Sequence, residues 1–440
     1  MNESRKRTIL LATLVCALLA ALDGTVTTTA MPRIAATLHG ESDLTWAVTA
    51  YLLASTVTIP IYGRVADLYG RKTPMLTGLA LFLIGSALCA AASTMPWLIV
   101  FRVVQGIGAG ALMTVGMTLV RDLYPPSQAR GMLRMQTLLA GMMVISFIGG
   151  PLAGGFVTDH WGWQWIFLGN LPIGLAAAAV LARFAPSSTV ERTETGRFDY
   201  AGLALLSSGI SFVLIGGWLL PAGLLALAVF VAVERKAEVP IVPLRLFGSR
   251  GYSAATAAGF LFTVAMMPAG LFLGVYFQQV LGYSATASGW LVLPLMGGMI
   301  IGNRLTAAVA IRSGRVRSAL AAGAVLVVAG SAPLAMLDSG IPLWMTLTCT
   351  ALIGFGAAPS MGGIAMVAQT TVDRRDIGAA TAGLNLVKQF GGSTGLATGQ
   401  ALLAAQQVGG TIAIVGTIGG LLALAAVLAI PDVNLLASAH

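Results

Sequence analysis

The chain of 440 residues is 57% hydrophobic and only 9% charged, whereas soluble domains carry roughly 25% charged residues. This composition excludes an ordinary soluble protein and indicates an integral membrane protein. The formal net charge of +9 comes from basic residues scattered through short loops, so it favours loops at a membrane surface over nucleic-acid binding.

Apolar stretches long enough to cross a bilayer recur along the whole chain. They lack the alternation of apolar and polar residues that barrel strands show, so the spans are expected to be helices. We predict an all-α polytopic protein with fourteen transmembrane helices, near residues 8–30, 44–62, 75–93, 97–120, 132–157, 165–184, 200–217, 220–234, 252–280, 285–303, 317–337, 342–368, 377–403 and 410–430.

The count depends on residues 201–233, which could form one long tilted helix or two short ones. With two helices, 22 of the 25 Lys and Arg residues fall on one side of the membrane. With one helix, every basic loop after residue 250 would move to the other side, against the positive-inside rule. We therefore predict two helices here, both termini in the cytoplasm, and a multi-pass protein of the cell membrane.

The first six and the last six predicted spans share a rhythm. Basic loops at 69–74 and 313–318 follow the second helix of each half, and charged loops at 122–131 and 372–378 precede the fifth. Two six-helix halves around a site at the bilayer midplane are a recurrent plan of secondary transporters. The expected domains are an N-terminal six-helix bundle, a linker with two extra transmembrane helices, and a C-terminal six-helix bundle, at residues 1–184, 185–251 and 252–440.

Three charged residues, Asp23, Arg102 and Lys388, lie well inside the predicted spans, away from the span ends, and such residues usually mark function. At about 1.5 Å per residue, Asp23 and Arg102 both lie roughly 8–10 Å below the outer boundary. They can therefore pair if their helices face one cavity, and Asp23 could then exchange a proton during transport. The alternative is a static ion pair that fixes helix packing.

Lys388 lies near the middle of the thirteenth predicted span, with Asn385 and Gln389 on neighbouring faces. These three residues and Thr27 are candidates for lining a substrate cavity, although Lys388 could instead bridge backbone carbonyls. One acid and two bases within the spans do not give a negative cavity. Monocationic, neutral or anionic lipophilic substrates are therefore expected over dications.

Five ordered motifs resemble one family. They are "LDGTVTTTAMP" (22–32), "GRVADLYGRK" (63–72), "FRVVQGIGAG" (101–110), "GGPLAGG" (149–155) and "WQWIFLGNLPIG" (163–174). Together they resemble the major facilitator superfamily, and within it the fourteen-span drug:proton antiporters that export quaternary ammonium compounds and other lipophilic drugs. The chain departs from the usual motifs at Thr28, Ser146, Gln164 and Lys388, where asparagine, glycine, arginine and arginine are common.

The resemblance implies the major facilitator fold and a role for two motifs. A conformational latch on the cytoplasmic side would comprise Gly63, Asp67, Gly70, Arg71 and Lys72, which could also act only as a topology anchor. An antiporter hinge motif in the fifth span would comprise Gly150, Pro151, Gly154 and Gly155, where proline and glycine favour a bend. A purely packing role for this motif is the alternative.

We expect a proton-coupled antiporter that exports lipophilic drugs or similar amphipathic molecules by alternating access and functions as a monomer in membrane lipid. An exporter of one endogenous metabolite, lipid or antibiotic is the alternative. A membrane sensor is less favoured. An intramembrane enzyme is also less favoured, because His39, His160 and His440 lie in loops or at the terminus and not within the spans. No cofactor, metal or nucleic acid is expected, and "GIGAGA" (106–111) lies mid-span rather than after a strand, which disfavours nucleotide binding.

Overall fold

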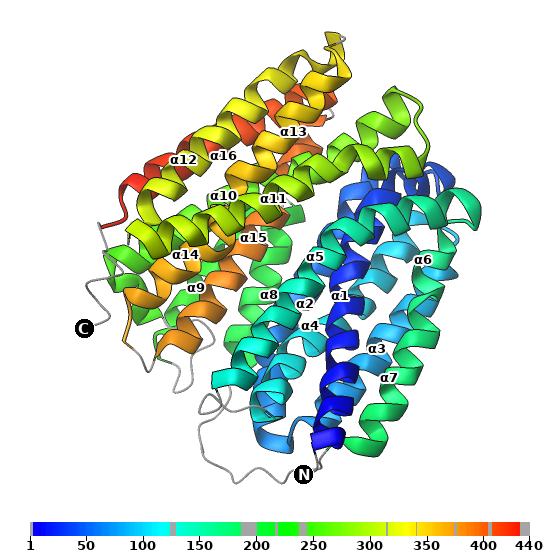
Figure 1. The fold of residues 1–440 in the computed structure, drawn as a ribbon, viewed down its shortest axis with the longest axis vertical. Coiled ribbons are helices and arrows are strands. Elements are labelled where there is room, and N and C mark those ends of the chain that lie inside the picture. The colour runs from blue at the N-terminus through cyan, green and yellow to red at the C-terminus, as the bar shows by residue number, and fades with distance from the viewer. Residues whose placement is uncertain are drawn as a thin grey trace. The chain divides into compact units, whose positions relative to one another are not determined.

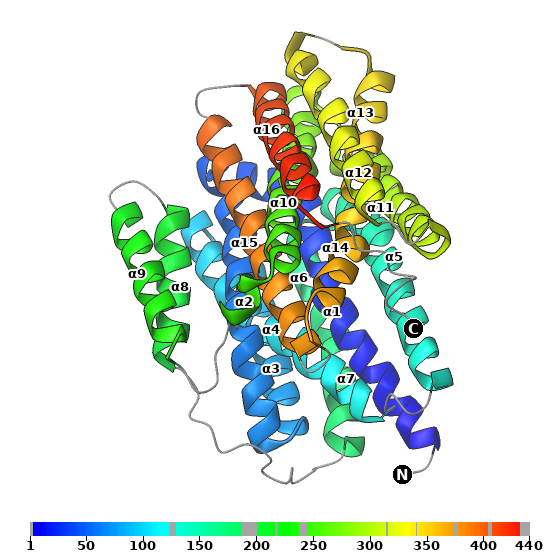
Figure 2. The ribbon, with the colours of Figure 1, turned by 90° about the vertical axis from the view of Figure 1, so that its left-hand side faces the viewer.

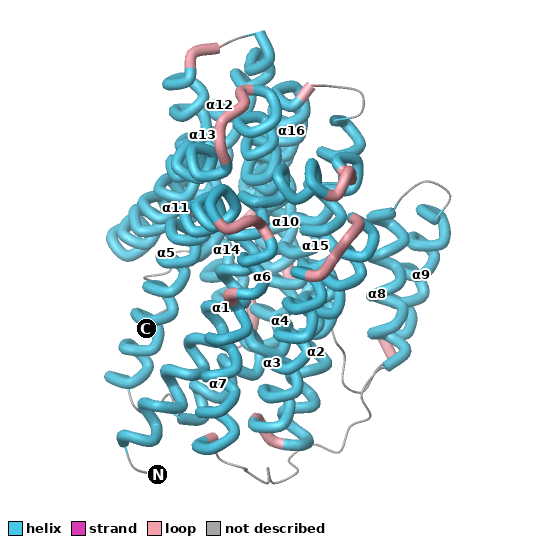
Figure 3. The backbone as a smooth tube through the Cα atoms, turned by 90° about the vertical axis from the view of Figure 1, so that its right-hand side faces the viewer, coloured by secondary structure: helices cyan, strands magenta, loops and turns pink. Residues whose placement is uncertain are grey.

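A computed structural model describes residues 3–123, 129–185, 200–215, 219–236, 244–313, 316–339, 341–373, 376–403 and 407–431. Every regular element in these ranges is a helix, and short loops join them (Figure 3). By length and apolar composition, ten helices of the described part can cross a membrane. The chain is thus an all-helical, multi-span protein, while the count of fourteen and the cytoplasmic placement of both ends stay predictions.

The described helices fall into two compact units, of which the first comprises Met1–Gly196 and Gly282–Trp290. It contains the helices α1 (Glu3–Thr37), η1 (Glu41–Asp43), α2 (Leu44–Tyr69), α3 (Lys72–Ala90), α4 (Met95–Leu123), α5 (Ala129–His160), α6 (Gln164–Leu168), α7 (Asn170–Phe184) and the first turns of α11 (Ala285–Ser313) (Figure 1).

The second unit comprises Arg197–Leu281 and Leu291–His440. It contains α8 (Tyr200–Ile215), α9 (Leu220–Glu234), η3 (Leu244–Gly248), α10 (Arg250–Val275), η4 (Tyr276–Val280), the rest of α11, α12 (Val316–Ser331), η5 (Ala332–Ser339), α13 (Leu343–Ala357), α14 (Pro359–Thr370), α15 (Ile377–Leu403) and α16 (Val408–Leu428). The domain boundaries expected from the sequence stay a prediction.

In the first unit, α1 packs against α4, α5 and α7, and α4 packs against α2 and α3. Glycines allow these helices to approach closely. A Cβ added to Gly85 on α3 would lie 2.5 Å from the backbone nitrogen of Gln105 on α4. The core between them holds large buried side chains such as Phe82 and Leu112. Close packing of α3 on α4 brings together Ser86 and Gln105, the polar groups that these two helices supply to the site.

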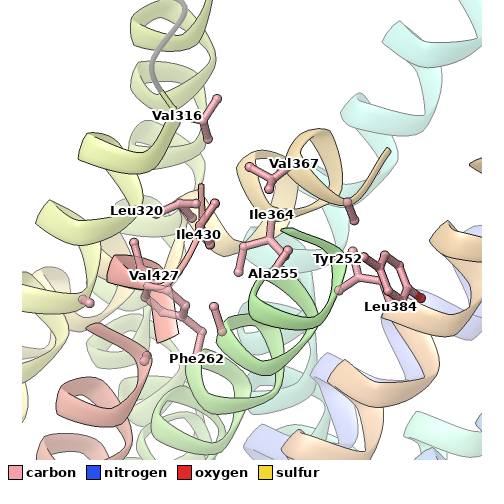
Figure 4. Close-up of a cluster of buried hydrophobic side chains, with 14 of the residues drawn as sticks. Tyr252, Ala255, Phe262, Val316, Leu320, Ile364, Val367, Leu384, Val427 and Ile430 are labelled. Carbon is pink, nitrogen blue, oxygen red and sulfur yellow. The ribbon is translucent and has the colours of Figure 1, made fainter. Parts of the chain in front are cut away.

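In the second unit, α10 packs against α15 and α16, and α12 packs against α13 and α16. The core is apolar, with Phe262, Leu320 and Val427 in one cluster and Tyr252 at its edge (Figure 4). The short helices α8 and α9 form an antiparallel pair, and α8 contacts α15 (Figure 2).

Four predicted spans depart from a single continuous α-helix: two are divided, and two change helix type at their ends. The span at 165–184 is divided at Gly169 into α6 and α7, and the span at 342–368 is divided between α13 and α14. The spans at 252–280 and 317–337 end in the π-helical turn η4 and the 3₁₀ segment η5. Pro359 has no backbone N–H and therefore favours the first turn of a new helix, which explains the start of α14.

Candidate functional site

Asp23 on α1 and Arg102 on α4 form an ion pair inside the first unit. Their side chains are almost fully buried, because the residues are only 2% and 1% exposed. The other carboxylate oxygen, Oδ1, accepts hydrogen bonds from Gln105 Nε2 at 2.7 Å and from Asn170 Nδ2 at 3.2 Å. Three side chains therefore converge on one carboxylate and satisfy both of its oxygens.

The guanidinium of Arg102 is enclosed as well. Its Nη1 donates to Gln105 Oε1 at 2.8 Å, and its Nε donates to the carbonyl of Ala47 at 3.3 Å. The Arg102 guanidinium carbon lies 4.0 Å from the ring centroid of Tyr51, a cation–π contact. Tyr51 belongs to α2, and its ring is held against α1, because its hydroxyl donates to the carbonyl of Ala20 at 3.0 Å.

A second layer orients the two amides that bind Asp23. Ser86 Oγ on α3 accepts from Gln105 Nε2 at 3.0 Å and from Asn170 Nδ2 at 2.9 Å, and it donates to the carbonyl of Phe167 at 3.1 Å. We call the residues Asp23, Ser86, Arg102, Gln105 and Asn170 the polar network. Because an unsatisfied buried charge is costly, such complete pairing is what allows a carboxylate to remain inside a helical bundle.

Sequence reasoning found the Asp23–Arg102 pair but assigned no role to Ser86, Gln105, Asn170 or Tyr51. One signal was present for Gln105, which lies three residues after Arg102 and hence on the same helix face. Ser86 and Asn170 lie on helices whose rotation cannot be read from the sequence. Their contribution appears only once α3 and α7 are packed.

From the sequence, the Asp23–Arg102 pair is expected to form if α1 and α4 face one cavity. The pair is present inside the first unit with both side chains almost fully buried, and a cavity beside it stays a prediction. Thr27, one turn beyond Asp23, is fully buried, and its hydroxyl has no hydrogen-bond partner among the described residues. Its candidacy for a substrate cavity therefore needs a different conformation and stays a prediction.

The segment predicted as a latch ends α2 and begins α3. Gly70 has a φ of 81°, a conformation that glycine adopts readily, and it ends α2. Arg71 Nη1 donates to the carbonyl of Ala66 at 2.5 Å, and Lys72 Nζ donates to the carbonyl of Ala182 near the end of α7 at 2.7 Å. These bonds anchor the segment within the first unit.

The latch function itself stays a prediction. The side chain of Asp67 lies outside the described part of the structure. Gly63 faces α4. A Cβ added to Gly63 would lie 3.8 Å from the Thr114 methyl carbon, an ordinary van der Waals distance, so helix packing does not require a glycine here.

The predicted hinge motif lies in α5, and Pro151 is inside the helix. A Cβ added to Gly150 would lie 2.6 Å from Thr25 Cβ, and one added to Gly154 would lie 2.7 Å from the carbonyl oxygen of Val26. Gly155 likewise packs against the start of α11, at Ala285. The motif therefore brings α1 and the first turn of α11 close to α5, which supports the packing alternative without testing the hinge.

In the second unit, the candidates Asn385, Lys388 and Gln389 lie on α15. Lys388 Nζ donates to the carbonyl of Ser360 at 3.0 Å, at the start of α14. The stem of Lys388 lies against Gly259 of α10, where an added Cβ would lie 3.1 Å from Lys388 Cγ. Asn385 is exposed, and Lys388 and Gln389 are half-buried. This contact with a backbone carbonyl agrees with the alternative in which Lys388 has a structural role instead of lining a substrate cavity.

Comparison with known proteins decides the family. The model of the Major Facilitator Superfamily matches residues 13–396. The chain belongs to this superfamily. Its members are transporters rather than enzymes, so the multi-pass transporter predicted from the motifs is confirmed.

Two related proteins align with most of this chain. The multidrug transporter protein MdtP of Bacillus subtilis (strain 168) is 33% identical over 414 residues, covering 90% of this chain and 75% of MdtP. The tetracenomycin C resistance and export protein of Streptomyces glaucescens is 31% identical over 413 residues, covering 90% of this chain and 76% of that protein. The first name describes multidrug transport, and the second describes resistance to tetracenomycin C and its export.

The fold is also seen in solved structures. The crystal structure of the POT family transporter PepTSo superimposes with a TM-score of 0.70 and 13% sequence identity, covering 98% of this chain and 97% of that chain. At this identity the likeness supports the transporter fold alone.

Proposed function

We propose that this superfamily member is a proton-coupled antiporter that exports lipophilic small molecules by alternating access. The names of MdtP and of the tetracenomycin C exporter support the substrate class. The fourteen-span topology with cytoplasmic termini, action as a monomer, and the latch and hinge roles belong to the same proposal. No cofactor is needed, because the proton gradient supplies the free energy.

The observation that carries the proposal is the buried Asp23 carboxylate and its partners. Its charge is satisfied by Arg102, Gln105 and Asn170 in the present arrangement. Protonation removes the charge that holds Arg102, so it weakens contacts that join α1, α4 and α7. A proton that weakens the contacts of the present arrangement favours a different arrangement of these helices, and this would link proton binding to a conformational equilibrium.

Transport in inverted membrane vesicles tests the coupling. Addition of a lipophilic drug to energised vesicles should release protons from the lumen in the wild type and should fail to do so in Asp23→Asn. Glu41→Gln is the matched control, since Glu41 is an exposed carboxylate in the same unit and its loss should leave coupling unchanged. Drug-dependent proton release by Asp23→Asn at equal expression would show that Asp23 is only a structural partner of Arg102.

A second candidate, export of one specific antibiotic or metabolite, is favoured by the dedicated relative from Streptomyces. A panel of cationic, neutral and anionic lipophilic compounds in the same vesicles separates the two. Proton release with many chemically unrelated compounds supports multidrug export, and release with one compound alone supports the dedicated exporter.

A further inference from the structure

A shallow groove lies on the surface of the first unit, where α1 and α7 run side by side (Figures 1 and 3). Its volume is about 360 Å³. Alanines form its floor, because Ala12 and Ala177 are only 7% and 5% exposed, whereas Leu11 and Ile173 beside them are 60% and 49% exposed. Small residues facing each other across the helix contact therefore create the depression.

The lining offers almost nothing to a polar solute. Thr8 is the one residue with a polar side chain among the eight that line the groove. Its hydroxyl already donates to the carbonyl of Ser4 at 3.0 Å. An apolar groove of this kind on a membrane-spanning helix pair fits a hydrocarbon chain.

One end of the groove is basic. Arg5 lies one turn before Thr8, and its Nε donates to the carbonyl of Phe184 at 3.0 Å. Arg183 is exposed on the same last turn of α7, and Lys72 donates to the carbonyl of Ala182 there. The positive charge of these three side chains is larger than the partial negative charge, about half a unit, at the C-terminus of α7. Residues 3–7 also contain two further basic residues and one acidic residue.

We propose that the groove binds one anionic phospholipid, with an acyl chain along α1 and α7 and the phosphate at Arg5 and Arg183. An apolar groove that ends in a basic cluster complements both parts of such a lipid, and anionic lipids are attracted by basic residues next to membrane helices. The groove shares no residue with the polar network around Asp23. The lipid proposal therefore does not depend on the proposed function. A second copy of the chain and a lipophilic drug are the competing occupants.

Native mass spectrometry of the purified full chain tests the proposal. Phosphatidylglycerol and phosphatidylcholine with identical acyl chains are titrated separately, and the bound lipid is counted. The wild type should bind phosphatidylglycerol more tightly. Arg5→Gln/Arg183→Gln should weaken phosphatidylglycerol binding about 25-fold, since each base near the surface contributes about fivefold, and should leave phosphatidylcholine binding unchanged.

A second pair of variants tests the groove itself. Ala176 and Ala179 are both exposed on α7, but only Ala176 lines the groove. Ala176→Phe should fill the groove and abolish the tight phosphatidylglycerol site, whereas Ala179→Phe should not. Arg317→Gln is the control for the lost arginine–carbonyl bond, because Arg317 Nη2 donates to the carbonyl of Leu428 at 2.6 Å at the end of α16.

Three results would overturn the proposal. The first is equal affinity of the wild type for the two lipids, and the second is unchanged phosphatidylglycerol binding in Ala176→Phe and in the double variant. The third is a wild-type dimer that Ala176→Phe dissociates, or a drug that displaces the lipid from the groove with higher affinity, because either would identify another occupant.

Discussion

Helices α5 and α15 each pack closely against another helix through glycines, one in each unit. Each carries two glycines four residues apart that contact the first long helix of the unit. In the first unit, Gly150 and Gly154 contact α1; in the second, a Cβ added to Gly391 or Gly395 would lie 2.5 Å from the carbonyl oxygen of Phe260 or Val264 on α10. Close helix contact through small residues is therefore repeated in both units.

The polar chemistry is not repeated. The first unit buries a complete ion pair with the amides of Gln105 and Asn170, whereas the facing helices of the second unit bring together Phe262, Leu320 and Val427. Lys388, the candidate charge on α15, is half-buried and donates to a backbone carbonyl. The comparison indicates that the units share a scaffold and differ in how strongly a charge is bound within it.

The largest effect is expected from Arg102→Met, which leaves the Asp23 carboxylate buried without its cation. Breaking a buried pair in this way costs about 3–5 kcal/mol. Unfolding by denaturant in detergent micelles would show the loss. The double variant Asp23→Asn/Arg102→Met should recover a large part of the stability, and a double variant as unstable as the single one would contradict this account.

Gln105→Leu should cost about 1.5–3 kcal/mol, because it removes a hydrogen bond to a buried charged group. The same unfolding measurement applies. Asn385→Leu is the control in the second unit, where the amide is exposed and the expected change is within about 0.5 kcal/mol. Equal effects at the two sites would mean that the amides around Asp23 add nothing to its stabilisation.

Gly154→Ala and Gly395→Ala should destabilise the protein by similar amounts, about 1–3 kcal/mol each, because the new methyl meets backbone atoms of α1 or α10. Gly149→Ala is the control on α5. Its nearest neighbour would be an Ile145 methyl at 3.9 Å, and alanine is the better helix former. Thermal unfolding that ranks Gly149→Ala with Gly154→Ala would exclude close packing as the reason for the glycines.

Lys388→Met should have the smallest effect on stability, within about 1 kcal/mol, because methionine keeps the stem against Gly259 and only one neutral acceptor is lost. Its effect should appear in transport, as reduced export of lipophilic anions with export of monocations unchanged. A loss of stability as large as that of Arg102→Met would show that Lys388 is a structural anchor.

The sequence was informative wherever a single helix carries the signal. Apolar length predicted an all-helical, multi-span chain, and ten helices of the described part can cross a membrane. The equal depth of Asp23 and Arg102 allowed the pairing that the structure contains. It was less informative where rotation about a helix axis matters. Trp161, Trp163 and Trp165 alternate along one short segment, and nothing in the sequence distinguishes them, yet Trp161 and Trp165 are 64% and 53% exposed and Trp163 is 4% exposed.

The sequence by itself determined that this protein is a helical membrane transporter with a carboxylate and a guanidinium at matching depth along two of its helices, since hydropathy, spacing and motifs are local properties. Only the tertiary structure decided that Ser86, Gln105 and Asn170 complete the polar network around Asp23 and that its residues are buried. The physical reason is that hydrogen bonds among α1, α3, α4 and α7 depend on how each helix is rotated, and the packing of glycines and large side chains sets that rotation.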